Sequence, residues 1–308
     1  MSVIIPARDV AATLPDTLDG LGTQRFGEPL EVIVVDDGST DATRAIAFAS
    51  PLVSRVVELG GVGPAQARNA GAAVARAELL AFLDADCRPT PGWLAAGSAA
   101  LGSAGLVLGE TRPRPDQPCG PFDRTLAVIG CSPLFESANL FVRRDLFERL
   151  GGFEGWLGPR DGKELGEDLW LGWRARRSGA RIAACAQALA HHAVFQRTAR
   201  GFVAERWRLR YFPALVRRVP ELRGELLYAG VFLNPHAARF DAGLAAVVLA
   251  TAARRPALGV GAIPYARVLV HDLREPDGAK RAAARLSADI VGLAAMVLGS
   301  VRYRTLLI

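Results

Sequence analysis

The sequence has few cysteines, and they form no recognisable framework. Its four cysteines, Cys87, Cys119, Cys131 and Cys185, lie far apart and contain no C-x-x-C pair. This spacing excludes a disulfide framework and a zinc site, and it indicates reduced thiols in the cytosol. A signal peptide is also missing, because the strand-like run 3–5 stands where its charged segment would begin. We therefore expect the protein to be cytoplasmic.

Long apolar runs are missing as well. Two apolar stretches, 242–253 and 288–301, lie in the last third of the chain, and both fall short of the ~20 residues needed to cross a bilayer. Intrinsic disorder is excluded, because 50% of the 308 residues are hydrophobic and 22% are charged. The length suits one large domain, or one domain with an elaborated tail.

Positive charge is concentrated in the last third of the chain. Residues 1–196 carry 19 Lys and Arg against 23 Asp and Glu, and residues 197–308 carry 18 against 8, so the balances of −4 and +10 give the net +6. A basic region of this kind binds nucleic acid or an anionic membrane surface, or is only solvated. Nearly all of this charge is arginine in an alanine-rich sequence, which is also typical of a GC-rich genome. Charge alone therefore does not select the partner.

The first 110 residues alternate short apolar runs with helical patterns. Strands are predicted at 3–6, 31–36, 53–58 and 79–84, and helices at 12–21, 42–49 and 65–77. This alternation predicts βαβ units in a parallel sheet. Ligands of such sheets bind beyond the carboxyl ends of the strands, and Asp36, Asp37, Asp84 and Asp86 lie at those ends.

The pattern changes after this region. Residues 106–142 are expected to be rich in loops, a helix is predicted from Gly166 to about Ser178, and a strand is suggested at 181–184. Beyond His192 the sequence is helical and rich in arginine. We therefore place a catalytic domain at residues 1–200 and a basic, mainly helical region at residues 201–308.

Two aspartates in the sequence Phe82-Leu83-Asp84-Ala85-Asp86 form the clearest candidate site. Side chains two residues apart on an extended segment point to the same side, so Asp84 and Asp86 can share one cation. Two carboxylates with no nearby cysteine favour a hard ion such as Mg²⁺ or Mn²⁺, which takes phosphate oxygens as further ligands. A bare D-x-D is common, however, and a pair of solvated aspartates in a turn is the alternative.

The order of several short motifs resembles that of the inverting family 2 glycosyltransferases. The motifs follow one another over residues 1–200 and are matched only loosely beyond them. They are Val3-Ile4-Ile5-Pro6, Val35 to Asp41, Ala67 to Gly71, Leu83 to Asp86, Ser137-Ala138-Asn139, Leu150-Gly151-Gly152-Phe153 and Gly166-Glu167-Asp168. The resemblance implies an α/β protein with the GT-A fold: a Rossmann-like, mostly parallel sheet flanked by helices, here with a C-terminal helical extension.

The resemblance also implies roles for residues that bind the nucleotide sugar. In such enzymes, residues at the positions of Pro6, Ala7 and Asp9 hold the nucleotide after the first strand. Asp37 resembles the aspartate that hydrogen-bonds the base, and Arg68 resembles a partner of base or phosphate. The segment Asp84, Ala85 and Asp86 resembles the D-x-D that holds the ribose and the metal-bound diphosphate, with Asp86 at the metal.

The catalytic group implied by the resemblance is Asp168, with Glu167 beside it. A general base at this position deprotonates the acceptor hydroxyl. Because Asp168 lies near the start of the predicted helix, we expect the helix dipole to favour its charged form. One base acting opposite the departing diphosphate gives direct displacement and inversion of the anomeric centre, so no nucleophilic carboxylate is needed.

Two histidines and two arginines near the end of the matched region are weaker candidates. Related enzymes often have a histidine here that completes the metal site, and we favour His191 over His192 for this role. Arg200, like Arg197, is expected to clamp phosphate from a loop, although a solvated basic face explains both arginines equally well.

The chain also departs from the family pattern. Trp170 stands where the family often has a second aspartate after the base, and Glu205-Arg206-Trp207 lacks the glutamine of the Q-x-x-R-W motif of processive synthases. We therefore expect transfer of a single sugar. The donor is expected to be a UDP-sugar, with GDP- or dTDP-sugars as alternatives, and the cofactor Mn²⁺ or Mg²⁺.

The acceptor and the partners of the protein remain open. The acceptor hydroxyl is expected to belong to an envelope polysaccharide, a lipid-linked molecule or a small molecule. No nucleic-acid partner is expected. Either the basic C-terminal region touches the cytoplasmic face of the inner membrane peripherally, or it is an ordinary helical subdomain.

Two other functions compete with this interpretation. A catalytically inactive nucleotide-sugar-binding module on the same scaffold is the main alternative, although such modules usually lose the D-x-D or the base, and this sequence has both. A D-x-D phosphatase is the other alternative, but Arg88 stands where that motif needs Thr or Val. The sequence therefore favours an enzyme.

Overall fold

The computed structural model describes residues 1–157 and 165–308, which divide into two compact units. The first unit comprises Met1–Cys119 and Thr125–Phe195, and the second comprises Gly120–Arg124 and Gln196–Ile308. The division falls at 195/196, five residues before the boundary expected from the sequence. In addition, the short segment Gly120–Arg124 belongs to the second unit, which the sequence did not indicate.

The first unit is built on a mixed sheet whose strand order is β3-β2-β1-β4-β7-β6-β8-β5. Strands β1 to β4 are parallel to one another and β6 is parallel to β8, whereas β7 runs antiparallel to β4 and β6, and β5 antiparallel to β8. The strands are β1 (Ser2–Ala7), β2 (Glu31–Asp37), β3 (Arg55–Leu59), β4 (Leu79–Leu83), β5 (Cys87–Pro89), β6 (Leu106–Pro113), β7 (Asn139–Arg143) and β8 (Ile182–His192). The strand–helix alternation predicted for the first 110 residues is therefore confirmed.

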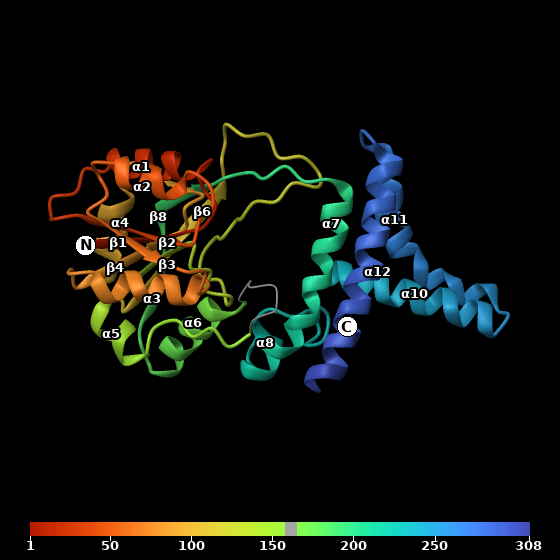
Figure 1. Ribbon diagram of the computed structural model, residues 1–308. Coiled ribbons are helices and arrows are strands. Elements are labelled where there is room, and N and C mark those ends of the chain that lie inside the picture. Colours follow the sequence, from red (N-terminus) through yellow and green to blue (C-terminus); the bar gives the residue numbers. More distant parts are fainter. Residues whose placement is uncertain (158–164) are drawn as a thin grey trace. The chain divides into compact units, whose positions relative to one another are not determined.

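Helices flank this sheet in the first unit (Figure 1). They are α1 (Leu14–Gly22), α2 (Thr43–Ala49), α3 (Pro64–Val74), α4 (Trp93–Leu101), α5 (Arg144–Arg149) and α6 (Glu167–Arg177). Helix α3 packs closely on β1 and β2 because Gly71 has no side chain. A Cβ at Gly71 would lie 2.4 Å from Cγ2 of Ile4, so any larger residue would push the helix off the sheet.

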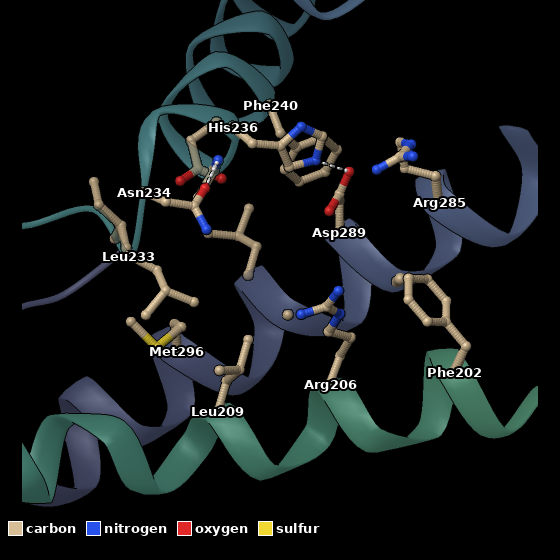
Figure 2. Close-up of a pocket in the computed structure, with 16 residues that line it drawn as sticks. Phe202, Arg206, Leu209, Leu233, Asn234, His236, Phe240, Arg285, Asp289 and Met296 are labelled. Atoms are coloured by element: carbon tan, nitrogen blue, oxygen red, sulfur yellow. Dashed lines mark hydrogen bonds and ion pairs between the residues drawn. The ribbon is translucent and has the colours of Figure 1, made fainter. Parts of the chain in front are cut away.

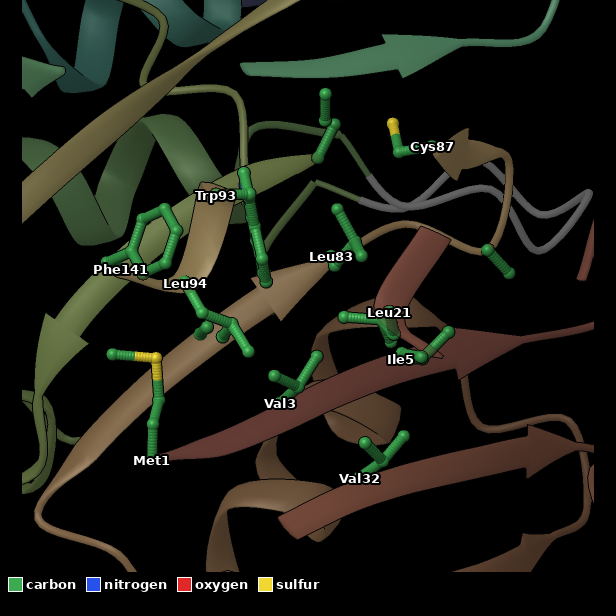
Figure 3. Close-up of a cluster of buried hydrophobic side chains, with 14 of the residues drawn as sticks. Met1, Val3, Ile5, Leu21, Val32, Leu83, Cys87, Trp93, Leu94 and Phe141 are labelled. Atoms are coloured by element: carbon green, nitrogen blue, oxygen red, sulfur yellow. The ribbon is translucent and has the colours of Figure 1, made fainter. Parts of the chain in front are cut away.

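The core of the first unit explains why its strands are continuously apolar. Val3 and Ile5 of β1 point to one face, where they belong to the same buried cluster as Leu21 of α1 and Trp93 of α4 (Figure 3). The intervening Ile4 points to the other face, against α3. Alternate residues of a strand point to opposite faces, so a strand covered on both sides needs apolar residues at every position.

Two expectations for the middle of the chain are met in part. The segment 106–142 is loop-rich between residues 114 and 138, as expected, but it also contains β6 and most of β7. The strand suggested at 181–184 is present and is longer, from Ile182 to His192. The sequence of β8 is rich in alanine, which is depleted in strands. The extended conformation of β8 therefore depends on its pairing with β6 and β5. Gly109 interrupts the pattern of β6, and the structure needs it because a Cβ there would lie 2.3 Å from Oδ1 of Asn139.

The second unit is helical over its described residues, as the sequence predicted. Its elements are α7 (Ala199–Glu205), η1 (Arg206–Tyr211), α8 (Phe212–Arg218), α9 (Leu222–Glu225), α10 (Pro235–Ala252), η2 (Pro256–Ala262), α11 (Ile263–Arg274) and α12 (Gly278–Tyr303). Helix α12 packs against α7, η1, α8 and α11. Between α10, α12 and η1 lies a pocket of about 100 Å³, where Nε2 of His236 is 2.8 Å from Oδ2 of Asp289 (Figure 2).

The last apolar stretch is longer than the sequence suggested. It forms part of α12, which has 26 residues and is, by length and composition, able to cross a membrane. The expectation that this stretch is too short is therefore wrong. Within the structure, 39% of the most apolar window of α12 is buried.

Candidate functional site

The D-x-D aspartates lie in the turn that follows β4, at the carboxyl end of the parallel strands. The backbone N–H of Asp84 donates to the carbonyl of Ala138, which fixes this turn beside the start of β7. The carbonyl of the intervening Ala85 accepts a hydrogen bond from Oγ1 of Thr17, at 3.0 Å. Both aspartates are partly accessible, so the turn presents two carboxylates at the edge where ligands of such sheets bind.

A buried arginine links Asp84 to the predicted catalytic residues. Nη2 of Arg68, on α3, is 2.8 Å from Oδ1 of Asp84, and its Nη1 is 3.2 Å from Oε1 of Glu167, on α6. Burial lowers the pKa of Arg68, but the charges of Asp84 and Glu167 outweigh it and raise the pKa. In the structure Arg68 joins α3, α6 and the D-x-D turn through two ion pairs. Its contact with base or phosphate stays a prediction.

Asp168 lies in the first turn of α6, next to Glu167. Its Oδ2 accepts from the backbone N–H of Ser137 at 3.4 Å, and its Oδ1 accepts from the N–H of Leu169 at 2.7 Å. Burial, followed by the charge of Glu167, raises the pKa of Asp168 to about 8, although Arg68 acts in the opposite direction. The backbone N–H of Leu169, at the start of the helix, favours the charged form as expected, but burial and a like charge exceed this effect.

Two residues beside this cluster received no role from the sequence. Oγ of Ser137 and Oε2 of Glu136 are buried and have no hydrogen-bond partner among residues 1–157 and 165–308. A buried polar atom without a partner costs free energy, so the fold keeps these two atoms at a cost to its stability. The motif Ser137-Ala138-Asn139 was the only signal in the sequence that pointed here.

Of the two neighbouring histidines, the structure places His192, and not the predicted His191, beside Asp86. Nε2 of His192 lies 3.4 Å from Oδ2 of Asp86, whereas His191 lies opposite Arg88 in the pairing of β5 with β8 and lines a separate pocket. Burial lowers the pKa of His191. Successive residues of a strand point to opposite faces, so only one of the two histidines reaches Asp86, and the register of β8 decides which.

The contacts of His192 suit a cation. Its Nδ1 lies 2.6 Å from the carbonyl of Ala193, which orients the ring with the Nδ1 proton on that bond and the lone pair of Nε2 toward Asp86. A lone pair and a carboxylate that face each other need a proton or a cation between them. Their separation of 3.4 Å is close to the roughly 3.0 Å between neighbouring ligands of an octahedral ion with bonds of about 2.1 Å.

A complete metal cage is not present in the part of the chain that the structure describes. No group of three or more His, Cys, Asp or Glu side chains there is arranged to hold a metal ion. Asp86 and His192 thus fit a cation only as two ligands of a larger set. Mg²⁺ and similar ions usually take their remaining ligands from water and substrate phosphates.

Asp37, predicted to bind the base, holds a loop in place. Its carboxylate accepts hydrogen bonds from the backbone N–H groups of Gly61, Val62 and Gly63, at 2.7 to 3.0 Å. Asp37 is buried, and these contacts fix the entry of α3, the helix that carries Arg68. Its hydrogen bond to the base stays a prediction, for which about one acceptor position of the carboxylate remains.

Asp9 connects the loops that follow β1 and β2. Its Oδ1 accepts from the backbone N–H and from Oγ1 of Thr40, at 2.7 and 3.0 Å, and the N–H of Thr40 is the main reason why the pKa of Asp9 is lowered. Pro6 and Ala7 end β1, where Ala7 pairs with Asp36. These residues therefore surround the carboxyl ends of β1 and β2.

Arg200 belongs to the second unit, whereas the residues described above belong to the first. It is an exposed residue of α7, in the second unit. Its predicted contact with phosphate stays a prediction.

The comparisons with known proteins agree with this arrangement. Residues 2–118 match the model of the family described as "Glycosyl transferase family 2". Over these residues the chain is a member of glycosyl transferase family 2. The matched range contains Arg68, Asp84 and Asp86, whereas Asp168 and His192 lie beyond it.

Two curated relatives illustrate the similarity of this family member to known proteins. A validoxylamine A glucosyltransferase of Streptomyces hygroscopicus subsp. jinggangensis is 30% identical over 74% of this chain and 63% of its own length. Glycosyltransferase AglE of Haloferax volcanii is 32% identical over 51% of this chain and 57% of its own length. The chain thus spans about six-tenths of the length of these relatives.

Solved structures show that the family member has the GT-A fold. A mannosyltransferase from Pyrobaculum calidifontis, solved with GDP-Man and Mn²⁺, has a TM-score of 0.66 and 24% identity over 98% of this chain and 86% of that one. S. aureus TarS 1-349, solved with UDP-GlcNAc, has a TM-score of 0.50 and 16% identity, and the match covers 99% of this chain and 92% of that one. These likenesses confirm the fold expected from the sequence.

Proposed function

We propose that the protein is an inverting, metal-dependent glycosyltransferase that moves a single sugar from a nucleotide-diphosphate sugar to an acceptor hydroxyl. One observation supports this most directly. Arg68 joins Asp84 to Glu167, which brings the D-x-D and the start of α6 together. In the sequence Arg68 is 16 residues from Asp84 and 99 residues from Glu167. The donor-binding and catalytic carboxylates assigned from separate motifs thus belong to one cluster.

Asp168 is the proposed general base. A base is most effective when its pKa is near the working pH, and burial together with Glu167 raises the pKa of Asp168 to about 8. The N–H of Ser137 and the N–H of Leu169 orient its two oxygens. The carboxylate accepts the proton of the acceptor hydroxyl while that oxygen attacks the anomeric carbon, and inversion follows because attack and departure are on opposite faces.

Asp86 and His192 are the proposed protein ligands of the metal. A bound Mn²⁺ or Mg²⁺ supplies Lewis-acid stabilisation of the leaving diphosphate. The facing lone pairs of Asp86 and His192 support this assignment, as does the Mn²⁺ in the mannosyltransferase of similar fold. Asp84, whose charge is balanced by Arg68, orients the ribose of the donor in this proposal.

The donor in this proposal rests on solved proteins of similar fold, and the acceptor rests on the sequence. Solved proteins of similar fold carry GDP-Man or UDP-GlcNAc, and we take a UDP-sugar as the first choice. The acceptor is a hydroxyl of an envelope polysaccharide, a lipid-linked molecule or a small molecule. In this proposal the protein works in the cytoplasm, with its basic C-terminal region in peripheral contact with the membrane.

Hydrolysis of nucleotide sugars with Mn²⁺ present tests the proposal. The wild-type protein is expected to release UDP, GDP or dTDP from one of the three donor classes, and Asp168→Asn to lose at least about 100-fold of this rate. Asp145→Asn, an exposed acidic residue of α5, is the matched control and is expected to keep full activity. Equal rates for Asp168→Asn and wild type would remove Asp168 from the mechanism, and no hydrolysis or binding of any donor would refute the activity.

A further inference from the structure

The second half of α10 turns its small residues inward and its large apolar residues outward. Gly243, Ala246 and Ala250 recur at helical spacing and are less exposed than their neighbours. They face η2, α11 or both: a Cβ on Gly261 would lie 2.8 Å from the Cβ of Ala246. A helix surrounded only by protein and water places its large apolar side chains on the packed face. This half of α10 does the reverse.

Exposed apolar residues gather on α10, η2 and the start of α11, and together we call them the apolar tip. Helix α10 and η2 pack side by side, so the elements that carry these residues are neighbours. Each member of the tip is between 42% and 62% exposed. The members are Leu244, Val247, Val248, Leu249, Leu258, Val260 and Ile263. A gathering of exposed large apolar residues on neighbouring elements is typical of a site of interaction.

The charge within the segment that forms the apolar tip has one sign. No Asp or Glu occurs between Asp241 and Asp272, and the arginines of this stretch are Arg254, Arg255 and Arg267. All three are exposed, and the first two lie in the turn between α10 and η2. An exposed apolar segment whose charged residues are all cations is complementary to a bilayer with anionic headgroups.

The first half of α10 is anchored, which leaves the tip as the end that reaches outward. His236 and Phe240 lie against α12, where Asp289 accepts from both Nε2 of His236 and the hydroxyl of Tyr265, each at 2.8 Å (Figure 2). Within the second unit, the end of α10 and the turn after it extend away from α12 (Figure 1). The tip is thus held by a fixed base, and its outer side is exposed among the residues of the second unit.

We infer that the apolar tip inserts into the interface of an anionic bilayer, with Arg254 and Arg255 contacting the lipid headgroups. This inference names the surface for the proposed membrane contact, and it does not depend on sugar transfer. Helix α12 is the other apolar candidate, but it packs against α7, η1, α8 and α11. Pairing of two copies through the tip is disfavoured, because it would bring the arginines of both copies together without an acidic partner.

Vesicle flotation of the full-length protein tests the inference. Wild type is expected to float with phosphatidylcholine vesicles that contain phosphatidylglycerol, and to bind pure phosphatidylcholine more weakly. The double variant Val248→Asp/Leu249→Asp is expected to lose about tenfold or more of its binding. Arg254→Gln/Arg255→Gln is expected to lose about 25-fold on anionic vesicles, about fivefold for each arginine, and little on neutral ones.

The matched control is Val301→Asp, on α12, where the side chain is 73% exposed but lies outside the tip. It is expected to bind vesicles like wild type. Loss of binding in Val301→Asp with retention in the tip variant would move the contact to α12 and overturn the inference. Wild-type protein that does not float, or that floats equally with both vesicles, would overturn it too.

Two further measurements keep the result interpretable. The tip variants are expected to keep wild-type circular dichroism and donor hydrolysis, since the tip contains none of the proposed catalytic residues. Vesicle binding without donor hydrolysis would refute only the proposed glycosyltransferase activity. Donor hydrolysis without vesicle binding would refute only the membrane contact of the apolar tip. If wild type forms a dimer that the tip variants dissociate, and does not float, the tip is an interface between copies and the inference fails.

Discussion

Replacing Asp168 with asparagine is expected to stabilise the first unit, and to do so more strongly as the pH rises. In the folded protein the pKa of Asp168 is raised from 3.8 to about 8, by burial and then by the charge of Glu167. Between these values the folded state holds a proton that the unfolded chain releases. The free energy of unfolding of the wild type therefore falls as the pH rises through this window. Asparagine does not titrate, so the free energy of unfolding of the variant does not fall with pH for this reason.

The structure sets the size of the effect. One pKa unit corresponds to about 1.36 kcal/mol, so the shift from 3.8 to about 8 gives an upper bound of about 4 kcal/mol at pH 7. Asp168 keeps part of its surface in water, and the charge of Arg68 opposes the shift. We therefore expect a gain of about 1 to 2 kcal/mol at pH 7, and close to none at pH 4.

Urea unfolding followed by tryptophan fluorescence measures this gain. Trp173 is buried in the first unit and its Nε1 donates to the carbonyl of Pro133, so its emission reports on the surroundings of α6. Asp145→Asn is the control: Arg149 holds the pKa of Asp145 below its usual range, so this variant is expected to show no gain at any pH. A difference between Asp168→Asn and wild type that stays constant between pH 4 and 8 would refute the reasoning.

Three further predictions concern the neighbours of Asp168. Arg68→Met is expected to destabilise the protein by about 3 kcal/mol in urea unfolding, because it leaves two carboxylates without their buried partner; an unchanged midpoint would contradict the ion pairs. Asp37→Asn is expected to cost about 1 to 3 kcal/mol in the same assay, because one of its oxygens becomes a donor facing backbone N–H groups. His192→Ala is expected to weaken Mn²⁺ binding, measured by calorimetry, at least about tenfold, and His191→Ala is expected to leave it unchanged. The opposite result would identify His191 as the metal ligand.

The secondary structure of the first 110 residues could be predicted because it depends on local patterns. Strands β1, β2 and β4 are apolar at every position, which indicates burial on both faces. Strands β6 and β8 were missed in whole or in part. Gly109 and the alanines of β8 carry no local strand signal, and only their neighbours in the sheet hold them extended.

The sequence alone determined the chemistry available to this protein: the types of side chain at the strand ends, their order along the chain and the family that this order resembles. The tertiary structure decided which groups meet. The register of β8 sends His192 and not His191 toward Asp86, and the packing of α3 places Arg68 between Asp84 and Glu167. Burial beside a like charge then reverses the protonation expected for Asp168. Periodicity is a local property, whereas register, ion pairing and desolvation depend on segments that lie far apart in the chain.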